Sequence, residues 1–419
     1  MPKDEPTLLD DSTRLAGGAG HGSAPEAPGQ CDLAVVGGGI LGLAVARELK
    51  GRHPALETVV LEAADRVGTG QTGRNSGVIH AGIYYTPGSL KARMCVAGAR
   101  AIYELCERRG IAHERCGKLI VARDESELGP LDELERRGRE NAVPGLRRLG
   151  SEELKEVEPS CVGVSALHSP NTGIVSFAEV ARALADDLAD QGVPVVTGCG
   201  VNAIERRGDR LALGHAHGET RARFAVFAAG ARADRLAVLA GAPADPRIVP
   251  FRGSYLKLRP ERRDLVRGMI YPVPDPSLPF LGVHLTRHID GEVSLGPTAL
   301  LAPRGALART AAWPGTWRMA RRWWRTGISE MRHAVSKRSL ARAAADYVPE
   351  LEGRDFEPYF AGVRAQALGR DGGLVDDFVV SETERALHVR NAPSPAATSS
   401  LALAELIADR AEPGLSQAP

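Results

Sequence analysis

The sequence lacks the features that mark several classes of protein. Its 419 residues contain no run of eighteen apolar residues, which excludes a membrane-spanning helix. The 53 lysines and arginines are balanced by 52 acidic residues, so no basic excess indicates nucleic-acid binding. Six cysteines occur without a CxxC pair or a metal-like spacing, so we expect neither a disulfide framework nor a metal site. We therefore expect a two-domain protein of the reducing cytoplasm.

The two ends of the chain carry no signal for folded structure. Residues 1–30 are rich in proline, glycine, alanine and serine, and they lack both the apolar stretch of a secretory signal and the arginine-rich pattern of an organellar one. We expect residues 1–30 to form a disordered leader and residues 413–419 a disordered tail.

Residues 32–62 predict a nucleotide-binding unit. An apolar strand at 32–36 leads into the sequence GGGILG at 37–42, and residues 43–50 have the pattern of a helix. Gly37 permits the tight turn, Gly39 the approach of a pyrophosphate, and Gly42 the close packing of helix on strand. A second strand ends in Glu62, where an acidic side chain binds ribose hydroxyls. This order predicts a bound dinucleotide, NAD or FAD, and the position of the unit at the start of the folded chain favours FAD.

Two further segments are placed to meet the dinucleotide. Residues 71–85 form a polar, glycine-rich run shortly after the second strand. Residues 224–231 form an apolar strand that ends in small residues, which allow a cofactor to approach the backbone closely. An ordinary strand-to-turn junction would give the same second pattern, so that segment alone decides nothing.

Several long segments of the chain, in the same order, resemble one known family. They are residues 71–92, 250–253, 271–276, 281–287, 362–367 and 391–398. From residue 31 to about residue 408 the chain resembles the L-2-hydroxyglutarate dehydrogenases, also called oxidases, within the D-amino-acid-oxidase-like flavoproteins. Residues 302–345 match this family only loosely, so no function is transferred to them.

The resemblance implies an α/β fold (α+β overall) in which a Rossmann-like FAD-binding domain adjoins a substrate domain with a mostly antiparallel sheet over the flavin. The implied FAD-binding domain comprises residues 31–95, 160–235 and 355–412, and the substrate domain residues 96–159 and 236–354. The implied reaction is the FAD-dependent oxidation of a dicarboxylate, L-2-hydroxyglutarate, to 2-oxoglutarate, with a quinone or oxygen as the electron acceptor. The residues expected to bind FAD are Gly37, Gly39, Ile40, Gly42, Glu62, Thr72, Gly73, Asn75, Ser76, Gly77, Ala229, Gly230, Pro395, Ala396, Ala397 and Thr398.

The reaction requires a base for the hydroxyl proton while hydride passes from C2 to flavin N5. Histidine suits this role because its ordinary pKa, about 6.5, lies near the working pH. His80 and His284 are the candidates. We favour His284, because its strand-like segment would belong to the substrate sheet over the flavin.

A dicarboxylate needs two cationic or donor-rich anchors, and the arginine fork matches a carboxylate in a bidentate way. Arg364 resembles the arginine with which related amino-acid oxidases hold the carboxylate next to the reacting carbon. For the distal carboxylate the candidates are Arg287 and Arg252. The residues expected to add hydroxyl donors are Tyr84, Tyr85 and Tyr255.

The chain departs from the family pattern at three positions. Gly70 stands where relatives usually carry histidine, Ser254 where glutamate is common, and Thr298 where asparagine is usual. Each departure could tune the flavin or the pocket. They leave open a second interpretation, in which the same fold acts on another 2-hydroxy acid or on an amino acid.

Residues 303–338 combine many arginines with four tryptophans. Such a segment could lie on an anionic membrane surface, at the inner face of the cell membrane, and so bring the enzyme to a quinone. We favour a solvated helix with its tryptophans packed inward over this membrane contact. A third interpretation is a non-catalytic flavin-fold protein that binds membranes through this segment. The joint presence of His80, His284, Arg287 and Arg364 disfavours it.

Overall fold

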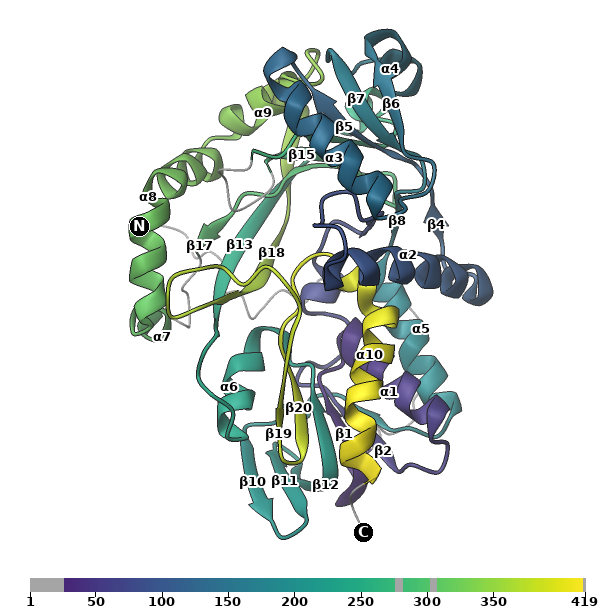
Figure 1. Ribbon diagram of the computed structural model, residues 1–419, viewed down its shortest axis with the longest axis vertical. Helices are drawn as coiled ribbons and strands as arrows, with labels where there is room; N and C mark the ends of the chain where they lie inside the picture. Colours follow the sequence, from purple (N-terminus) through teal and green to yellow (C-terminus); the bar gives the residue numbers. More distant parts are fainter. Residues whose placement is uncertain (1–25, 276–281, 302–306, 417–419) are drawn as a thin grey trace.

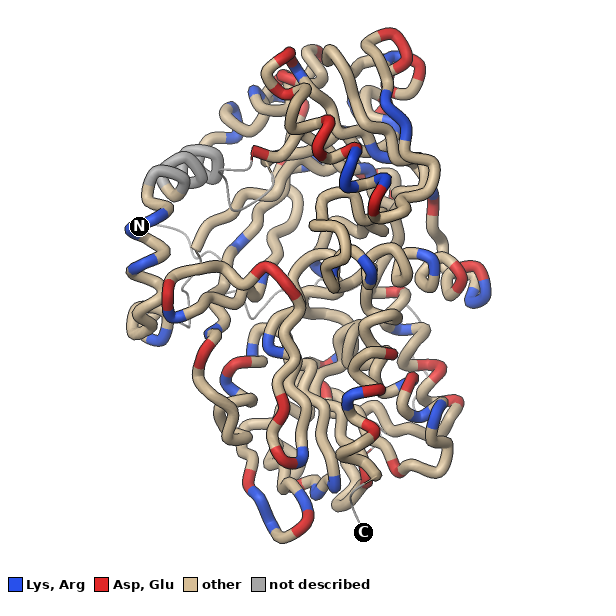
Figure 2. The backbone as a smooth tube through the Cα atoms, viewed as in Figure 1, with Lys and Arg blue, Asp and Glu red and all other residues tan. Residues whose placement is uncertain are grey.

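The computed structural model describes residues 26–275, 282–301 and 307–416 (Figure 1). Residues 1–25 of the predicted leader and 417–419 of the predicted tail lie outside the described residues. The predicted bounds are wrong at both ends, because Gln30 begins a strand and residues 413–416 continue the last helix. The structure contains two large sheets, one in the lower and one in the upper half of Figure 1. Acidic and basic residues are interspersed over both halves (Figure 2).

The first sheet is built around the buried strand β1 (Gln30–Val36). It pairs in parallel with β2 (Thr58–Leu61) on one side and with β12 (Gly218–Phe227) on the other. Its remaining strands are β9 (Val195–Val196), β10 (Ala203–Arg207), β11 (Arg210–His215), β19 (Val379–Thr383) and β20 (Ala386–Asn391). Because β1, β2, β12 and β20 run in parallel, their carboxyl ends meet at one edge of the sheet.

Four helices pack together beside this sheet: α1 (Ile40–Arg52), α2 (Leu90–Arg109), α5 (Phe177–Asp190) and α10 (Ala396–Ser416), with α1, α5 and α10 grouped on the right of Figure 1. They share one core with β1. Leu33 of β1, Leu43 of α1, Ile102 of α2, Leu184 of α5 and Leu403 of α10 are all fully buried in it. The burial of large aliphatic side chains stabilises this arrangement by about 1.5–3 kcal/mol for each. The C-terminal helix thus belongs to the same core as the first strand.

The second sheet is mostly antiparallel. Its order is β17-β13-β16-β15-β14-β5-β7-β6, with β18 on the other edge of β13, and only β14 and β5 pair in parallel among the described pairs. The strands are β5 (Lys118–Ala122), β6 (Arg147–Gly150), β7 (Ser165–Ser169), β13 (Arg247–Leu258), β14 (Met269–Pro272), β15 (His284–Arg287), β16 (Val293–Gly296), β17 (Leu300–Leu301) and β18 (Phe356–Leu368). A third, small sheet contains β3 (Val78–Ile79), β8 (Gly173–Val175) and β4 (His113–Glu114).

Helices cover both faces of the second sheet at β5. Leu119 packs with Leu340 of α9 (Lys337–Ala345), whereas Ile120 packs in a separate cluster with Leu131 of α3 (Leu128–Glu140). The other helices are α4 (Ser151–Val157), α6 (Ala233–Leu239), α7 (Leu307–Ala311) and α8 (Pro314–Val335). No helix among the described residues is both long enough and apolar enough to cross a membrane.

The predicted domain ranges do not follow the sheets everywhere. The strands β7 and β18 lie within ranges assigned to the FAD-binding domain, yet both are hydrogen-bonded into the second sheet. Residue spacing cannot reveal this, because strand pairing is a property of the folded chain. The predicted ranges thus differ from the observed sheets at β7 and β18, and the division of the chain into two domains stays a prediction.

Candidate active site

A cavity of about 1220 Å³ lies where the carboxyl ends of β1, β2 and β12 face strands of the second sheet. Its wall includes Val36 and Gly37 after β1, Glu62 after β2, and Ala229 and Gly230 after β12. Ligands of open parallel sheets bind outside the carboxyl ends of the strands. The position of this cavity is therefore that of a nucleotide site.

The turn after β1 forms the floor of this site. Gly37 has a φ of +119°, and a Cβ atom there would lie 2.4 Å from the carbonyl oxygen of Ala228, so only glycine fits. The helix α1 begins at Ile40, with Gly39 and Ile40 in the cavity wall. The amides of a helix N-terminus attract anions. Gly42 lies behind this wall, where a Cβ atom would come within 2.0 Å of the Gly37 carbonyl oxygen, so it serves close packing.

Glu62 is held rigidly at the end of β2. Its carboxylate accepts hydrogen bonds from the backbone N–H of Gly38, at 2.5 Å, and of Ala64, at 2.7 Å. It also forms part of the cavity wall. A fixed carboxylate at this point can accept hydrogen bonds from ribose hydroxyls.

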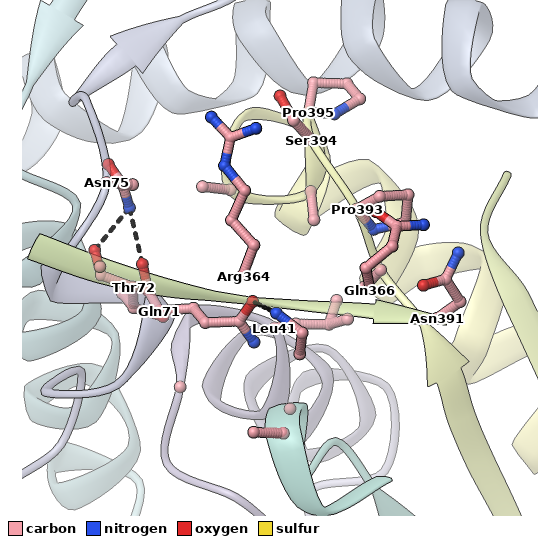
Figure 3. Close-up of a pocket in the computed structure, with 18 of the residues that line it drawn as sticks. Leu41, Gln71, Thr72, Asn75, Arg364, Gln366, Asn391, Pro393, Ser394 and Pro395 are labelled. Carbon is pink, nitrogen blue, oxygen red and sulfur yellow. Dashed lines mark hydrogen bonds between the residues drawn. The ribbon is translucent and has the colours of Figure 1, made fainter. Parts of the chain in front are cut away.

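The loop after β2 is fixed by Asn75 (Figure 3). The Asn75 amide donates to the carbonyls of Gln71, at 3.1 Å, and Thr72, at 2.7 Å, and its side-chain oxygen accepts from the Gly77 N–H, at 2.8 Å. Thr72, Asn75 and Ser76 line the cavity. Gly73 and Gly77 are not among the described lining residues. They shape the loop instead, because a Cβ atom on either would come within 2.7 Å of a backbone oxygen.

The start of α10 completes the cofactor side of the cavity. Pro395, Ala396, Ala397 and Thr398 all line it. The Thr398 hydroxyl accepts a hydrogen bond from the His80 N–H, at 3.1 Å, and donates to the Val78 carbonyl, at 3.2 Å. The helix start is thereby linked to the segment that carries a candidate base.

His284 lies in the cavity wall as a neutral imidazole. Its Nδ1 donates to the Gly282 carbonyl, at 2.8 Å, and its ring stacks on Tyr271 with 3.9 Å between centroids. Because Nδ1 carries the proton, Nε2 keeps a free lone pair. Burial lowers the pKa of His284 to about 3, and the charges of Arg364 and Lys118 contribute to this. The residue is therefore in the form that can accept a proton.

His80 lines the same cavity. Its Nδ1 is buried without a hydrogen-bond partner among the described residues, and its Nε2 lies 3.5 Å from the Ser394 hydroxyl. Burial, followed by the charge of Lys118, holds the pKa of His80 well below its ordinary value. Both candidate bases are thus neutral near pH 7.

The structure brings some of the predicted substrate residues to the cavity and leaves others outside it. Arg364, Tyr84, Tyr85 and Tyr255 line the cavity. In Figure 3 Arg364 extends from β18 toward the side where Ser394 and Pro395 lie. The adjacent Ala365 N–H donates to the Gln71 side chain, at 2.9 Å, which ties β18 to the cofactor loop.

Arg252 and Arg287 are absent from the cavity wall formed by the described residues. Arg252 is exposed on β13, between the buried Phe251 and Gly253, and Arg287 forms an ion pair with Glu114 at 3.0 Å. Successive side chains of a strand point to opposite faces. Arg252 is one position from Gly253, and Arg287 is three positions from His284, so each arginine points away from the face that lines the cavity. Neither position therefore places an arginine in the described cavity wall.

Two residues at this end of the cavity were not predicted from the sequence. Tyr271 lines the cavity and stacks on His284. Lys118 is only 2% exposed, and its Nζ lies 4.8 Å from the ring centroid of Tyr84 and 4.6 Å from that of Tyr271. A lysine at the head of the otherwise apolar run 118–122 was the available signal.

The departures at Ser254 and Thr298 contact each other. The Ser254 N–H donates to the Thr298 hydroxyl, at 3.1 Å, and the Thr298 N–H donates to the Ser254 carbonyl, at 3.2 Å. Neither is among the described residues that line the cavity, whereas Gly70 is. Thr298 contributes its hydroxyl to this contact, whereas Ser254 contributes only backbone atoms.

Comparison with known proteins places the chain among flavoenzymes. The sequence model described as FAD dependent oxidoreductase matches residues 32–410. The mitochondrial L-2-hydroxyglutarate dehydrogenase of Homo sapiens is 43% identical over 93% of this chain and 90% of its own length. The L-2-hydroxyglutarate dehydrogenase of Indibacter alkaliphilus is 41% identical over 88% of this chain and 96% of its own length.

Solved structures share the fold at low sequence identity. The FAD-bound L-alpha-glycerophosphate oxidase of Mycoplasma pneumoniae matches with a TM-score of 0.74 and 22% identity, over 92% of this chain and 95% of that chain. The glycine oxidase of Bacillus cereus matches with a TM-score of 0.68 and 17% identity, over 91% and 95%.

Proposed function

Because the chain belongs to the L-2-hydroxyglutarate dehydrogenase family of FAD-dependent oxidoreductases, we propose that it oxidises L-2-hydroxyglutarate to 2-oxoglutarate. The predicted family, α/β fold and FAD cofactor are confirmed by these comparisons. The glycine turn at Gly37, the amides at the start of α1 and the carboxylate of Glu62 would hold the dinucleotide. The chain is an FAD-dependent hydroxy acid dehydrogenase.

The observation that carries the proposal is the grouping of one arginine and two neutral histidines at the substrate end of the cavity. Arg364, His80 and His284 all line it, and they come from separate segments of the chain. Arg364 is suited to hold the carboxylate next to the reacting carbon. A neutral histidine beside it is suited to accept the hydroxyl proton.

Bound FAD supplies the acceptor for the hydride that leaves C2. His284 Nε2 takes the hydroxyl proton, while its Nδ1 stays fixed on the Gly282 carbonyl. His284 suits this role better than His80, because the hydrogen bond at Nδ1 sets its tautomer and the Tyr271 ring sets its plane. The product is a 2-oxo acid, and the substrate hydrogens have left as one hydride and one proton.

The alternative substrates, another 2-hydroxy acid or an amino acid, rested on the departures from the family pattern. Ser254 and Thr298 contact each other outside the described cavity wall, which removes most of that support. The non-catalytic interpretation does not account for two neutral histidines, His80 and the buried His284, in the same cavity wall as Arg364. We therefore propose L-2-hydroxyglutarate as the substrate over these alternatives.

We propose that a membrane quinone receives the electrons and that α8 supports a peripheral membrane contact. Trp317 and Trp324 are 65% and 56% exposed, whereas Trp313 is buried in a cluster with Phe251. Arg318 and Arg321 are exposed on the same helix, which is the blue-marked helix on the left of Figure 2. Part of the predicted segment, residues 303–306, lies outside the described residues. Tryptophans beside arginines suit the interface of an anionic bilayer.

Dye-linked turnover with chemical identification of the product tests the proposed reaction. L-2-hydroxyglutarate should give 2-oxoglutarate in one-to-one proportion with reduced dye. D-2-hydroxyglutarate and L-malate should react with a kcat/KM lower by about tenfold or more, because the polar site rejects a misplaced carboxylate. Faster turnover of L-malate or an L-amino acid would contradict the proposal.

A further inference from the structure

Lys118 is a buried cation behind the substrate end of the cavity: it is not among the described residues that line the wall, but it contacts two that are. It starts β5, on the same face as Ile120, and both faces of this strand are covered by helices. The Nζ atom lies between the rings of Tyr84 and Tyr271, and both rings line the cavity. A lysine in such a place normally has an acidic partner, since burying an unpaired charge is costly.

Among the described residues, no carboxylate is paired with Lys118. Burial lowers its pKa to about 8, and the group that favours its charged form is the thiol of Cys95. The Lys118 charge in turn lowers the pKa of His80 and of His284, so it acts across the substrate end of the cavity. The described neighbours of its charge are thus two aromatic rings and a thiol, and a bound anion would be its first charged partner.

The Tyr84 hydroxyl is a second unsatisfied group at the same place. It is buried and has no hydrogen-bond partner among the described residues, although Lys118 Nζ lies over the ring that carries it. The Lys118 charge and the unpartnered hydroxyl therefore belong to one place beside the Tyr84 ring. The two groups together would satisfy one carboxylate oxygen and its negative charge.

We propose that Lys118, acting with the Tyr84 hydroxyl, recognises the distal carboxylate of the substrate and makes the enzyme selective for dicarboxylates. This inference rests on the proposed function. It gives the role first predicted for Arg252 and Arg287 to a residue on another strand. Arg364 then holds the carboxylate next to the reacting carbon, and Lys118 holds the carboxylate at the other end of the substrate.

The test compares L-2-hydroxyglutarate with L-2-hydroxypentanoate, which has a methyl group in place of the distal carboxylate. In Lys118→Met, kcat/KM for L-2-hydroxyglutarate should fall about 100-fold, because a charged anchor is lost. The value for L-2-hydroxypentanoate should change less than about threefold, because the apolar chain makes no use of the charge. Lys118→Arg should recover part of the lost selectivity.

Tyr84→Phe and Lys257→Met complete the set of variants. Tyr84→Phe should lower kcat/KM for the dicarboxylate about tenfold, and adding it to Lys118→Met should cause little further loss, because the two groups act as a unit.

Lys257 is the control for removing a lysine from this sheet. It lies on another strand of the same sheet and pairs with Glu292 and Glu357. Lys257→Met should leave the ratio between the two substrates unchanged.

A binding measurement separates recognition from turnover. The oxidised enzyme should bind 2-oxoglutarate about 100-fold more weakly in Lys118→Met, as followed by the flavin absorbance, while 2-oxopentanoate binding should be unchanged. The variant should also have a raised melting temperature, since an unpaired buried charge is removed. A purely structural lysine would instead lower the melting temperature and affect both ligands equally, which would overturn the proposal.

The wild-type enzyme gives an independent test that needs no variant. As the pH rises through about 8, Lys118 loses its charge and kcat/KM for the dicarboxylate should fall, whereas that for L-2-hydroxypentanoate should stay flat. The other titratable or charged groups facing Lys118 are Cys95, Tyr84, Tyr271, His80, His284 and Arg364. Burial raises the pKa of the thiol and both phenols, and it lowers the pKa of both histidines. The thiol, the two phenols and the two imidazoles therefore do not titrate near pH 8.

The result distinguishes failure of this inference from failure of the proposed function. If wild type oxidises L-2-hydroxyglutarate but Lys118→Met keeps the wild-type ratio between the two substrates, the inference is wrong and the function stands. If wild type prefers L-2-hydroxypentanoate, the proposed function is wrong and the inference with it.

Discussion

The protonation state of single residues decides whether the site can perform its chemistry. In the free enzyme the pKa of His284 is about 3, so its imidazole is neutral over the whole physiological range. The depressed pKa is caused mainly by burial, which disfavours the imidazolium. When substrate carboxylates are bound, their negative charge favours the imidazolium that forms as the proton is transferred.

Replacing His284 should stop the chemistry without removing the cofactor. In His284→Ala the rate of anaerobic flavin reduction by L-2-hydroxyglutarate should fall about 10²–10⁴-fold, the range for a lost general base, while the FAD content stays that of wild type. The wild-type pH profile of kcat/KM should show no acid limb from this imidazole above about pH 4. Stopped-flow absorbance measures the rate of flavin reduction, and its dependence on substrate concentration at each pH gives the pH profile.

His288 provides a matched control for this variant. It follows β15, donates to or accepts from the Ser294 hydroxyl at 2.7 Å, and is not among the described residues that line the cavity. His288→Ala should keep flavin reduction within about threefold of wild type. An unchanged rate in His284→Ala would transfer the role of base to His80.

Sequence reasoning placed single residues in the cavity wall where their position depends on local geometry. Gly37 and Glu62 could be predicted because a tight turn and the end of a strand fix them within one βαβ unit. Arg252 and Arg287 were placed by motif alone, and strand alternation carries their side chains away from the cavity. Lys118 could not be assigned, because its site depends on Tyr84 and Tyr271 from distant segments.

At the scale of elements, the contact between α2 and α10 positions the flavin end of the cavity. A Cβ atom on Gly98 of α2 would lie 2.4 Å from the Thr398 carbonyl oxygen and 2.6 Å from the Ser399 Cα. Backbone atoms cannot yield as a flexible side chain can. The small residue on α2 thus allows α10 to begin where Ala396, Ala397 and Thr398 line the cavity.

Gly98→Ala should therefore displace the start of α10. We expect it to lower the free energy of unfolding by about 1–3 kcal/mol, as overpacking does, and to weaken FAD binding. Thermal denaturation and titration of the apoprotein with FAD measure these effects. Gly129→Ala on α3 is the control, because nothing lies within 4 Å of its Cβ position. A stable Gly98→Ala with wild-type FAD affinity would contradict this account of the helix contact.

The proposed membrane role of α8 also belongs to this scale. Trp317→Ser combined with Arg321→Gln should reduce cosedimentation with anionic vesicles at least about threefold and leave turnover with a soluble dye unchanged, because lipid binding here depends on aromatic and basic side chains together. Arg139→Gln, on the exposed part of α3, is the control for loss of one positive charge. Wild type that fails to bind anionic vesicles would refute the membrane contact.

Elements that follow one another in the chain were predicted correctly, whereas pairings between distant segments were not. The strand predicted at 32–36 and the helix after it agree with β1 and α1, and the strand predicted to end at Glu62 agrees with β2, which ends one residue earlier at Leu61. The pairing of β18 with β13 joins residues 356–368 to residues 247–258 and could not be read from either segment. In the segment with four tryptophans, burial of Trp313 and exposure of Trp317 depend on what the rest of the fold covers.

At the scale of the whole molecule, the cavity is a joint product of the two large sheets. The first sheet and α10 supply the cofactor side, and β13, β15 and β18 supply residues of the substrate side, including Tyr255, His284 and Arg364. Neither sheet contains the full set of groups that the reaction requires. This arrangement places a neutral base and an arginine opposite a nucleotide cradle.

The central claim is that this chain oxidises L-2-hydroxyglutarate with bound FAD. Its most direct test is the visible flavin absorbance of the purified protein under anaerobic conditions, before and after one equivalent of each candidate substrate. L-2-hydroxyglutarate should bleach the band about tenfold or more faster than D-2-hydroxyglutarate or L-malate does. A flavin band that L-2-hydroxyglutarate does not bleach, in protein that is reduced by dithionite, would contradict the account.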